Sequence, residues 1–336
     1  MSVRELEELA AALDEHFVEP TERLNIDSHA LVLREVLFHD ENRYWQFTPA
    51  TPGQPSFSER LLAWLNNKGL DSHDAGTLLR LVPELQFVDR DDMLTLYRAA
   101  FNGPIQRWLI DVLGLTFAMP ANELQATMLA GFDSTWFCPI TDSFDIAQFH
   151  HANAIASKDQ RPPWRILKRF GDGDKIRNYM EEHGLARLVL LEDFVGSGTQ
   201  VAAPLLYASE LLTLPLLFVP LIITIDGLER VRDLVKEAPN VAVAPVFVLP
   251  RHVQVREQPS DAELPLFAML RTIVSKTFPL VQAPMPPESD GLQESFGFRG
   301  LGTLLVMHTN CPNNTLPLVW HTAPEWNALF PRVSRA

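Results

Sequence analysis

The stretch from Leu188 to Gln200, LVLLEDFVGSGTQ, constrains the fold more than any other part of the chain. It begins with four consecutive apolar residues, as is typical of a strand buried on both faces of a parallel sheet. Glu192 and Asp193 follow at the carboxyl end of that strand, and a turn of small residues leads into a second apolar stretch. Open α/β sheets bind ligands where a strand, a turn and a helix meet in this way. We therefore expect a parallel α/β sheet with a ligand site after this strand.

The chemistry of this stretch suits a phosphorylated sugar. Turn amides and the positive end of the following helix favour a phosphate, while an acidic pair suits sugar hydroxyls or a magnesium ion. The alternative is an ordinary strand-to-helix turn in which a Ser or Thr caps the helix. A cap does not require two carboxylates at the end of a buried strand, where burying charge is costly. The ligand interpretation is therefore favoured.

Composition narrows the remaining possibilities. A chain of 336 residues, 46% of them hydrophobic, is long enough for two domains or for one domain with a large extension. A net charge of −14 argues against a general nucleic-acid or membrane-surface binder. Cys138 and Cys311 suggest neither a disulfide framework nor a zinc site. Pro215 and Pro220 interrupt the most apolar run, which is better interpreted as buried sheet than as a membrane span. We expect a cytoplasmic protein.

Two regions with different periodicity follow one another along the chain. Residues 1–115 are predicted to be a helical N-terminal domain, because apolar residues recur there at helical spacing between turns. The short helices could form a helix-turn-helix DNA reader, but the segment is acidic and lacks a basic recognition helix. A helical cap or a protein-docking domain is the better interpretation. In residues 116–336 strands and helices alternate, which predicts parallel strands joined by right-handed crossovers.

A second strand and turn repeat the pattern of the central stretch. Residues 134–140, STWFCPI, are predicted to be a strand, followed by Thr141, Asp142 and Ser143 and then by a helix. Asp142 and Ser143 could contact a ligand or could cap that helix, and the residues favour neither. His150 and His151 face different sides of the helix, so we do not expect them to chelate one metal.

Three further groups of polar residues have both a functional and an ordinary explanation. The basic segment 158–177 is most simply a solvated helical face. Arg251 and His252 follow a predicted strand and could reach a phosphate or a base, or could lie in an exposed loop. A later amide-bearing loop could bind a base or could simply form turns; it contains Asn310, Asn313, Asn314 and Thr315.

The central stretch resembles the phosphoribosyl diphosphate (PRPP) loop of type I phosphoribosyltransferases. Glu192 and Asp193 match the family's acidic pair, and Gly196 to Gly198 match most of its turn. Two features depart from the family pattern. The first acid is Glu where Asp is commoner, and Thr199 and Gln200 stand where a small residue and then Thr are usual.

Two other segments narrow the resemblance. With PITDSFDIAQF and the C-terminal run from Gly297 to Arg332, the chain is similar to the phosphoribosyltransferase-like family of bacterial conflict and antiphage defence systems (PRTase-CE), some of whose members are retron effectors. The resemblance covers residues 134–332. It implies an α/β fold with a type I phosphoribosyltransferase-like parallel sheet flanked by helices. It also implies that Asp142 and Ser143 lie near pyrophosphate and that the segment 158–177 closes over the diphosphate.

The motif and the resemblance together predict a phosphoribosyltransferase-like enzyme, an antiphage effector that binds PRPP or a nucleotide and transfers or cleaves at ribose C1. Glu192 and Asp193 are the expected catalytic residues, holding the ribose hydroxyls directly or through Mg²⁺, the expected cofactor. The expected phosphate- and PRPP-binding residues are Gly196, Ser197, Gly198, Thr199, Asp142 and Ser143.

Two other functions stay open. The protein could be a non-catalytic PRPP or nucleotide sensor that signals through its N-terminal helices. It could also be an interaction module in a larger defence complex, with a protein or ribonucleoprotein partner on the helical domain.

Overall fold

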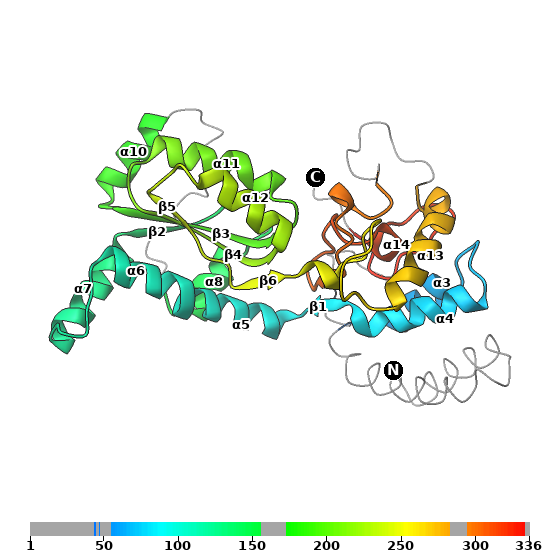
Figure 1. Ribbon diagram of the computed structural model, residues 1–336. Helices are drawn as coiled ribbons and strands as arrows, with labels where there is room; N and C mark the ends of the chain where they lie inside the picture. The colour runs from blue at the N-terminus through cyan, green and yellow to red at the C-terminus, as the bar shows by residue number, and fades with distance from the viewer. Residues whose placement is uncertain (1–43, 45–46, 48–54, 156–172, 283–293, 333–336) are drawn as a thin grey trace. The chain divides into compact units, whose positions relative to one another are not determined.

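The computed structural model describes residues 44, 47, 55–155, 173–282 and 294–332 (Figure 1). By their contacts they form two compact units: one comprises the described residues up to Arg90 and from Arg251 onward, the other Asp91–Pro250. This division does not coincide with the sequence-based boundary at residue 115. The helices expected within residues 2–37 and most of the basic segment 158–177 lie outside the described residues.

The unit Asp91–Pro250 contains the predicted parallel sheet. Its strands are β2 (Thr135–Pro139), β3 (Arg187–Val195), β4 (Leu216–Thr224), β5 (Val241–Val243) and β6 (Phe247–Leu249). The order is β2-β3-β4-β5, and β6 pairs with the carboxyl half of β4; every pairing is parallel. The apolar run over residues 240–249 predicts a single strand, but the structure divides it into two around Pro245, whose nitrogen carries no hydrogen to donate.

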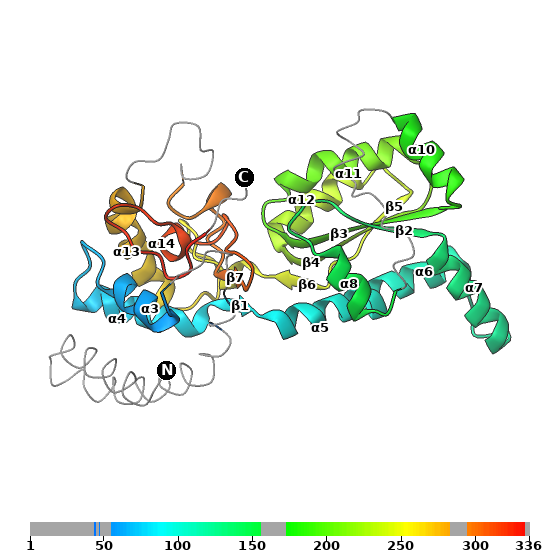
Figure 2. The same cartoon turned by 180° about the vertical axis from the view of Figure 1, so that it is seen from behind.

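Helices cover both faces of this sheet, as Figures 1 and 2 show. One face carries the crossover helices α10 (Gly173–Glu182), α11 (Thr199–Leu211) and α12 (Ile225–Val235). The other face carries α5 (Arg90–Ala100), the π-helical turn η2 (Phe101–Ile105), α6 (Gln106–Val112) and α8 (Ile146–Ala152), and α7 (Ala121–Asp133) precedes β2. Strands in sequential order with right-handed crossovers place their connecting helices on one side.

The alternation of side chains along the strands supplies both apolar layers. Leu188 and Leu190 of β3 pack in one cluster with Ile176 of α10 and Leu205 of α11. On the opposite face Phe137 of β2 contacts the rings of Phe101 and Phe149. Because both layers are filled, the polar residues at the carboxyl ends of β2 and β3 stand out against an apolar sheet.

The other unit brings together segments that are far apart in sequence. Its helices are α3 (Phe57–Leu65), α4 (Ser72–Leu81), α13 (Leu266–Val281) and α14 (Pro317–Trp320), with short turns η1 (Val82–Glu84), η3 (Arg251–Val253) and η4 (Phe298–Gly300). β1 (Gln86–Val88) pairs in parallel with β7 (Leu305–Met307). The apolar run LGTLLVM, residues 301–307, predicts a strand. β7 lies within it and pairs with β1 in a sheet of its own.

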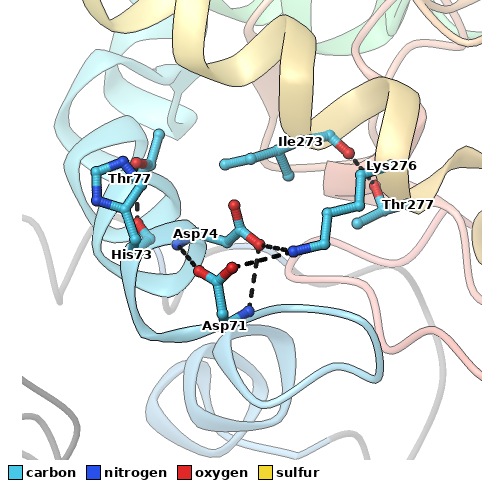
Figure 3. Close-up of polar contacts among 7 residues, drawn as sticks. All are labelled: Asp71, His73, Asp74, Thr77, Ile273, Lys276 and Thr277. Carbon is cyan, nitrogen blue, oxygen red and sulfur yellow. Dashed lines mark hydrogen bonds and ion pairs between the residues drawn. The ribbon is translucent and has the colours of Figure 1, made fainter.

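Specific contacts explain why the C-terminal residues fold with the N-terminal helices. The Trp64 indole donates to the Leu318 carbonyl at 2.8 Å, and Phe330 packs among aromatic rings that include Phe57 and Phe87. Figure 3 shows Lys276 of α13 bonded to Asp71 and Asp74, the two carboxylates of the capping box that begins α4. Contacts between residues so far apart in the sequence form only in the folded chain, and no local sequence pattern indicates them.

None of the described helices combines the length and the apolar character that crossing a membrane requires. The most apolar run of the sequence contributes the end of α11 and all of β4, which is buried along its length.

Candidate functional site

The acidic pair lies inside β3. The sequence predicted Glu192 and Asp193 at the end of the strand, but β3 continues to Val195 before the turn begins. Gly198 has a positive φ of 73° and directly precedes α11, which begins at Thr199. Glycine adopts this left-handed conformation without the strain that a Cβ atom adds. The small-residue turn is thus required by the backbone that joins β3 to α11.

A neighbouring helix start fixes the position of this turn. The Thr224 hydroxyl donates to the Gly196 carbonyl at 2.8 Å and accepts the Gly227 amide at 3.0 Å, which makes Thr224 the N-cap of α12. A Cβ atom on Gly227 would lie 2.2 Å from the Gly196 oxygen, so only glycine fits there. The sequence analysis did not predict a role for Thr224 or Gly227 at the site. A Thr between an apolar run and a helical pattern is nevertheless a recognisable signal of a helix cap.

The second predicted turn converges on the acidic pair. β2 lies beside β3, so residues 141–143 and the carboxylates share one edge of the sheet. Thr141 binds Glu192 twice, through its amide to Oε2 at 3.1 Å and through its hydroxyl to Oε1 at 2.7 Å. Ser143 donates to Asp193 Oδ1 at 2.9 Å. The structure therefore brings together three of the predicted site residues, Glu192, Asp193 and Ser143, and adds Thr141.

The remaining predicted residues have less central positions. Asp142 is exposed. Ser197 and Thr199 are half-buried, with their hydroxyls 3.0 Å apart at the start of α11. The cap of α8 is Asp145, which accepts the Gln148 amide, so the alternative of a cap by Asp142 or Ser143 is wrong.

Counting protons in this cluster shows how the two carboxyl groups are linked. Oxygen–oxygen contacts run from Glu192 to Thr141 at 2.7 Å, from Thr141 to Ser143 at 2.7 Å and from Ser143 to Asp193 at 2.9 Å. Three such hydrogen bonds need three protons, and the two hydroxyls supply only two. A proton on Glu192 completes a chain that ends at an ionised Asp193.

The surroundings of Glu192 favour this protonated form. Glu192 and Asp193 are 2% and 4% exposed. Burial, and then the charge of Asp193, raise the pKa of Glu192 well above its ordinary value, although hydrogen bonds from Thr141 and Ser143 oppose the shift. Like charges held this close in a dry site favour sharing of one proton.

Tyr97 of α5 adds a third ionisable group beside the pair. It is 2% exposed, and burial together with the charges of Asp193 and Asp145 raises its pKa, which keeps the phenol protonated. Its backbone carbonyl accepts the Asn153 side chain at the end of α8. The spacing of apolar residues predicts Tyr97 as a core position only, because nothing in a helix ninety-six residues upstream of Asp193 indicates an interaction with that carboxylate.

The family model of PRTase-CE matches residues 61–332. The chain belongs to the PRTase-CE family. Comparison with curated proteins and with solved structures found no match. The PRTase-CE region begins within α3 and ends beyond α14, so it takes in described parts of both units and extends upstream of the resemblance noted from residue 134.

Other residues singled out in the sequence occupy varied positions in this PRTase-CE protein. The His150 ring packs against Phe137 and Phe149. Cys138 and Cys311 are buried, as expected, and burial raises the pKa of Cys311 to about 12. Arg251 and His252 lie in η3. The amide-bearing loop belongs to the unit of α3 and α13, where Asn314 donates to the Phe298 carbonyl.

Glu192→Gln is expected to stabilise the protein at neutral pH. The pKa of Glu192 is higher in the folded protein than in the unfolded chain. The protonated side chain therefore contributes its full stabilisation at pH values below the pKa of the unfolded chain. This stabilisation is lost as the pH rises through the pKa of the folded protein. Gln is neutral at every pH, and its amide can donate to Thr141 as the protonated carboxyl does.

We expect a free energy of unfolding about 1–3 kcal/mol higher for Glu192→Gln at pH 7.5, the scale on which neutral replacements of buried charges stabilise proteins. The difference should vanish near pH 4, at which both side chains are neutral. Urea unfolding at the two pH values measures it. Glu181→Gln on the exposed surface of α10 is the control, with little change at either pH. A destabilised Glu192→Gln variant at pH 7.5 would show that Glu192 is ionised in the folded protein.

Proposed function

We propose that this PRTase-CE protein binds a phosphorylated ribose, as PRPP or a nucleotide, at the carboxyl edge of β2 and β3 and acts at its C1. The observation that carries the proposal is that the 141–143 turn contacts the acidic pair on the strand that leads into the 196–199 turn. The side chains of Glu192 and Asp193 contact hydroxyls of the 141–143 turn. The two residues lie three and two positions before Val195, where β3 ends and the turn suited to a phosphate begins.

Each part of such a ligand has a chemically suited group nearby. The amides of residues 196–199 at the start of the 13-residue helix α11, with the Ser197 and Thr199 hydroxyls, suit the 5′-phosphate. Glu192 and Asp193 suit the 2′ and 3′ hydroxyls. Asp142 and Ser143, on the turn that follows β2, are assigned to the neighbourhood of the diphosphate.

Magnesium fits this arrangement as a shared ion. Among the described residues no three His, Cys, Asp or Glu side chains are placed to hold a metal. Mg²⁺ commonly takes only one or two protein carboxylates and completes its shell with phosphate oxygens and water. Asp193 would supply one carboxylate, and Glu192 would supply a second once the charge of the ion displaces its proton. The ion would neutralise charge on the diphosphate.

The reaction is a displacement at C1. In transfer, the bond from C1 to the diphosphate oxygen breaks, the electron pair leaves with the diphosphate, and an acceptor atom bonds to C1. In nucleotide cleavage the base leaves and water takes the acceptor's place. Both routes develop positive charge on the ribose ring, which a buried ionised Asp193 stabilises. A protonated Glu192 can hold a ribose hydroxyl as a donor.

A role in bacterial antiphage defence, of the retron-effector type, is proposed on the family resemblance. The effector would act in the cytoplasm by depleting or modifying a nucleotide, and a protein or ribonucleoprotein partner would dock on the N-terminal helical domain of residues 1–115.

A second candidate is a sensor that binds the same ligands without turnover. The departures at Thr199 and Gln200 favour it, as does the acidic pair's engagement by Thr141 and Ser143. Ligand-dependent thermal stabilisation without products would identify a sensor. An interaction module, the third possibility, would form a stable complex whether or not the 196–199 turn was mutated.

The test of catalysis is product analysis. Purified protein is incubated with Mg²⁺, PRPP and a panel of nucleotides, and products are followed by mass spectrometry. We expect a released base, or a new glycosidic product with pyrophosphate. Binding without any product would favour the sensor, and no binding of any phosphorylated ribose would remove both candidates.

A further inference from the structure

The hydroxyls of Thr141 and Ser143 have the arrangement of a vicinal diol on the acidic pair. They lie 2.7 Å apart, and each contacts a different carboxyl group in the chain described above. Like the hydroxyls of Thr141 and Ser143, each vicinal hydroxyl of a ribose has one proton to donate and two lone pairs that can accept. Such a diol could replace Thr141 and Ser143 in the chain with every hydrogen bond preserved.

The 141–143 turn already occupies and covers the carboxyl groups. Glu192 uses one oxygen for the Thr141 amide and the other for the Thr141 hydroxyl, and Asp193 Oδ1 binds both Ser143 and the Phe194 amide. With 2% and 4% exposure, neither side chain can be reached by a sugar while the 141–143 turn covers it. Ligand hydroxyls and turn hydroxyls therefore compete.

The connection of this turn to the sheet allows it to move. Ile140 makes the last backbone bond of the β2–β3 ladder, to the Leu191 carbonyl at 2.9 Å. From Thr141 onward the amide and the hydroxyls bind carboxyl side chains of β3. Exchanging the two hydroxyl bonds for equivalent ones from a ligand would leave the ladder intact.

We propose that Thr141 and Ser143 form a hydroxyl latch that competes with the substrate, and that the site selects ligands with a vicinal ribose diol because only a diol replaces both latch hydroxyls. The inference rests on the proposed function and adds to it an autoinhibitory contact and a preference for ribose over 2-deoxyribose. Opening the latch also carries Ser143 and Asp142 away from the carboxyl groups.

The experiment uses ribose 5-phosphate and 2-deoxyribose 5-phosphate as probes, since neither carries a diphosphate that could bind the turn. Calorimetry of the full chain should show ribose 5-phosphate binding at least about tenfold tighter than the deoxy sugar, the equivalent of about one net hydrogen bond. Ser143→Ala, which weakens the latch, should tighten ribose 5-phosphate binding several-fold. Ser209→Ala, which removes a hydroxyl on α11 bonded to Leu206, is the matched control and should bind as the unmodified protein does.

Hydrogen exchange on the unmodified protein tests the latch without a variant. Saturating ribose 5-phosphate should speed amide exchange at Thr141, because its bond to Glu192 is released. If binding of ribose 5-phosphate slows amide exchange across residues 140–144, or leaves it unchanged, the latch is overturned and the proposed function stands. The same conclusion follows if Ser143→Ala weakens that binding. Binding of PRPP but not of ribose 5-phosphate leads to it as well. Failure of both to bind overturns the proposed function and the latch with it.

Discussion

Alanine at both Glu192 and Asp193 is expected to weaken PRPP binding by at least about a hundredfold and to abolish any turnover. Two hydrogen bonds to charged or strongly polar groups are lost, each worth about 1.5–3 kcal/mol, and a hundredfold change in affinity corresponds to about 2.7 kcal/mol. The loss should be largest with Mg²⁺ present, because the same carboxyl groups are its proposed ligands. Titration calorimetry with and without Mg²⁺ measures the change.

The matched control for this variant removes the same number of acidic side chains from the same unit. Glu181 and Glu182 are also adjacent acids, but both are exposed on α10. Their double alanine variant should bind PRPP within about twofold of the unmodified protein, as expected for surface changes away from a site. Circular dichroism checks that the Glu192 and Asp193 variant keeps its helices and strands. A folded variant that still turns over substrate would remove both residues from the catalytic site.

Gly227→Ala is expected to lower the free energy of unfolding by about 3 kcal/mol or more and to disrupt the phosphate turn. The new methyl group would lie 2.2 Å from the Gly196 carbonyl oxygen, a backbone atom that cannot rotate away as a side chain can. Overpacking typically costs about 1–3 kcal/mol, and more where the neighbour cannot give way. To relieve the contact, α12 or the 196–198 turn must shift. Such a shift breaks the hydrogen bonds of the Thr224 hydroxyl that join the two.

Gly103 supplies the control for Gly227. It lies in η2 of the same unit, has no atom within 4 Å of an added Cβ, and has an ordinary backbone conformation. Gly103→Ala should be neutral or stabilising by up to about 1 kcal/mol. Chemical unfolding of the two variants gives the comparison, and binding of inorganic phosphate reports on the turn. Equal stability of the two variants would mean that the 196–198 turn yields easily and is not held by α12.

Local patterns in the sequence were sufficient to predict the sheet and much of the candidate site. The four apolar residues before Glu192 have the signature of a doubly buried strand, and β3 occupies that position. Strands in alternation with helices led to the parallel pairing that the structure contains. The clustering of Glu192, Asp193 and Ser143 follows from two neighbouring parallel strands whose carboxyl ends share an edge.

Features that depend on distant pairing could not be predicted in this way. The sequence of β7 indicates a strand but carries no information that its partner is β1, more than two hundred residues earlier. Tyr97 has the periodicity of an ordinary core position in α5. Thr141 was noted only as a turn residue, because its role depends on the Glu192 carboxyl fifty-one residues away.

A structure of this protein with ribose 5-phosphate bound is the most direct test of the account. The prediction places the phosphate within hydrogen-bond distance of the 196–199 amides and the ribose hydroxyls on Glu192 and Asp193, with Thr141 and Ser143 displaced from them. A sugar phosphate bound away from the β3–α11 turn, or bound there with its hydroxyls far from both carboxyl groups, would contradict it.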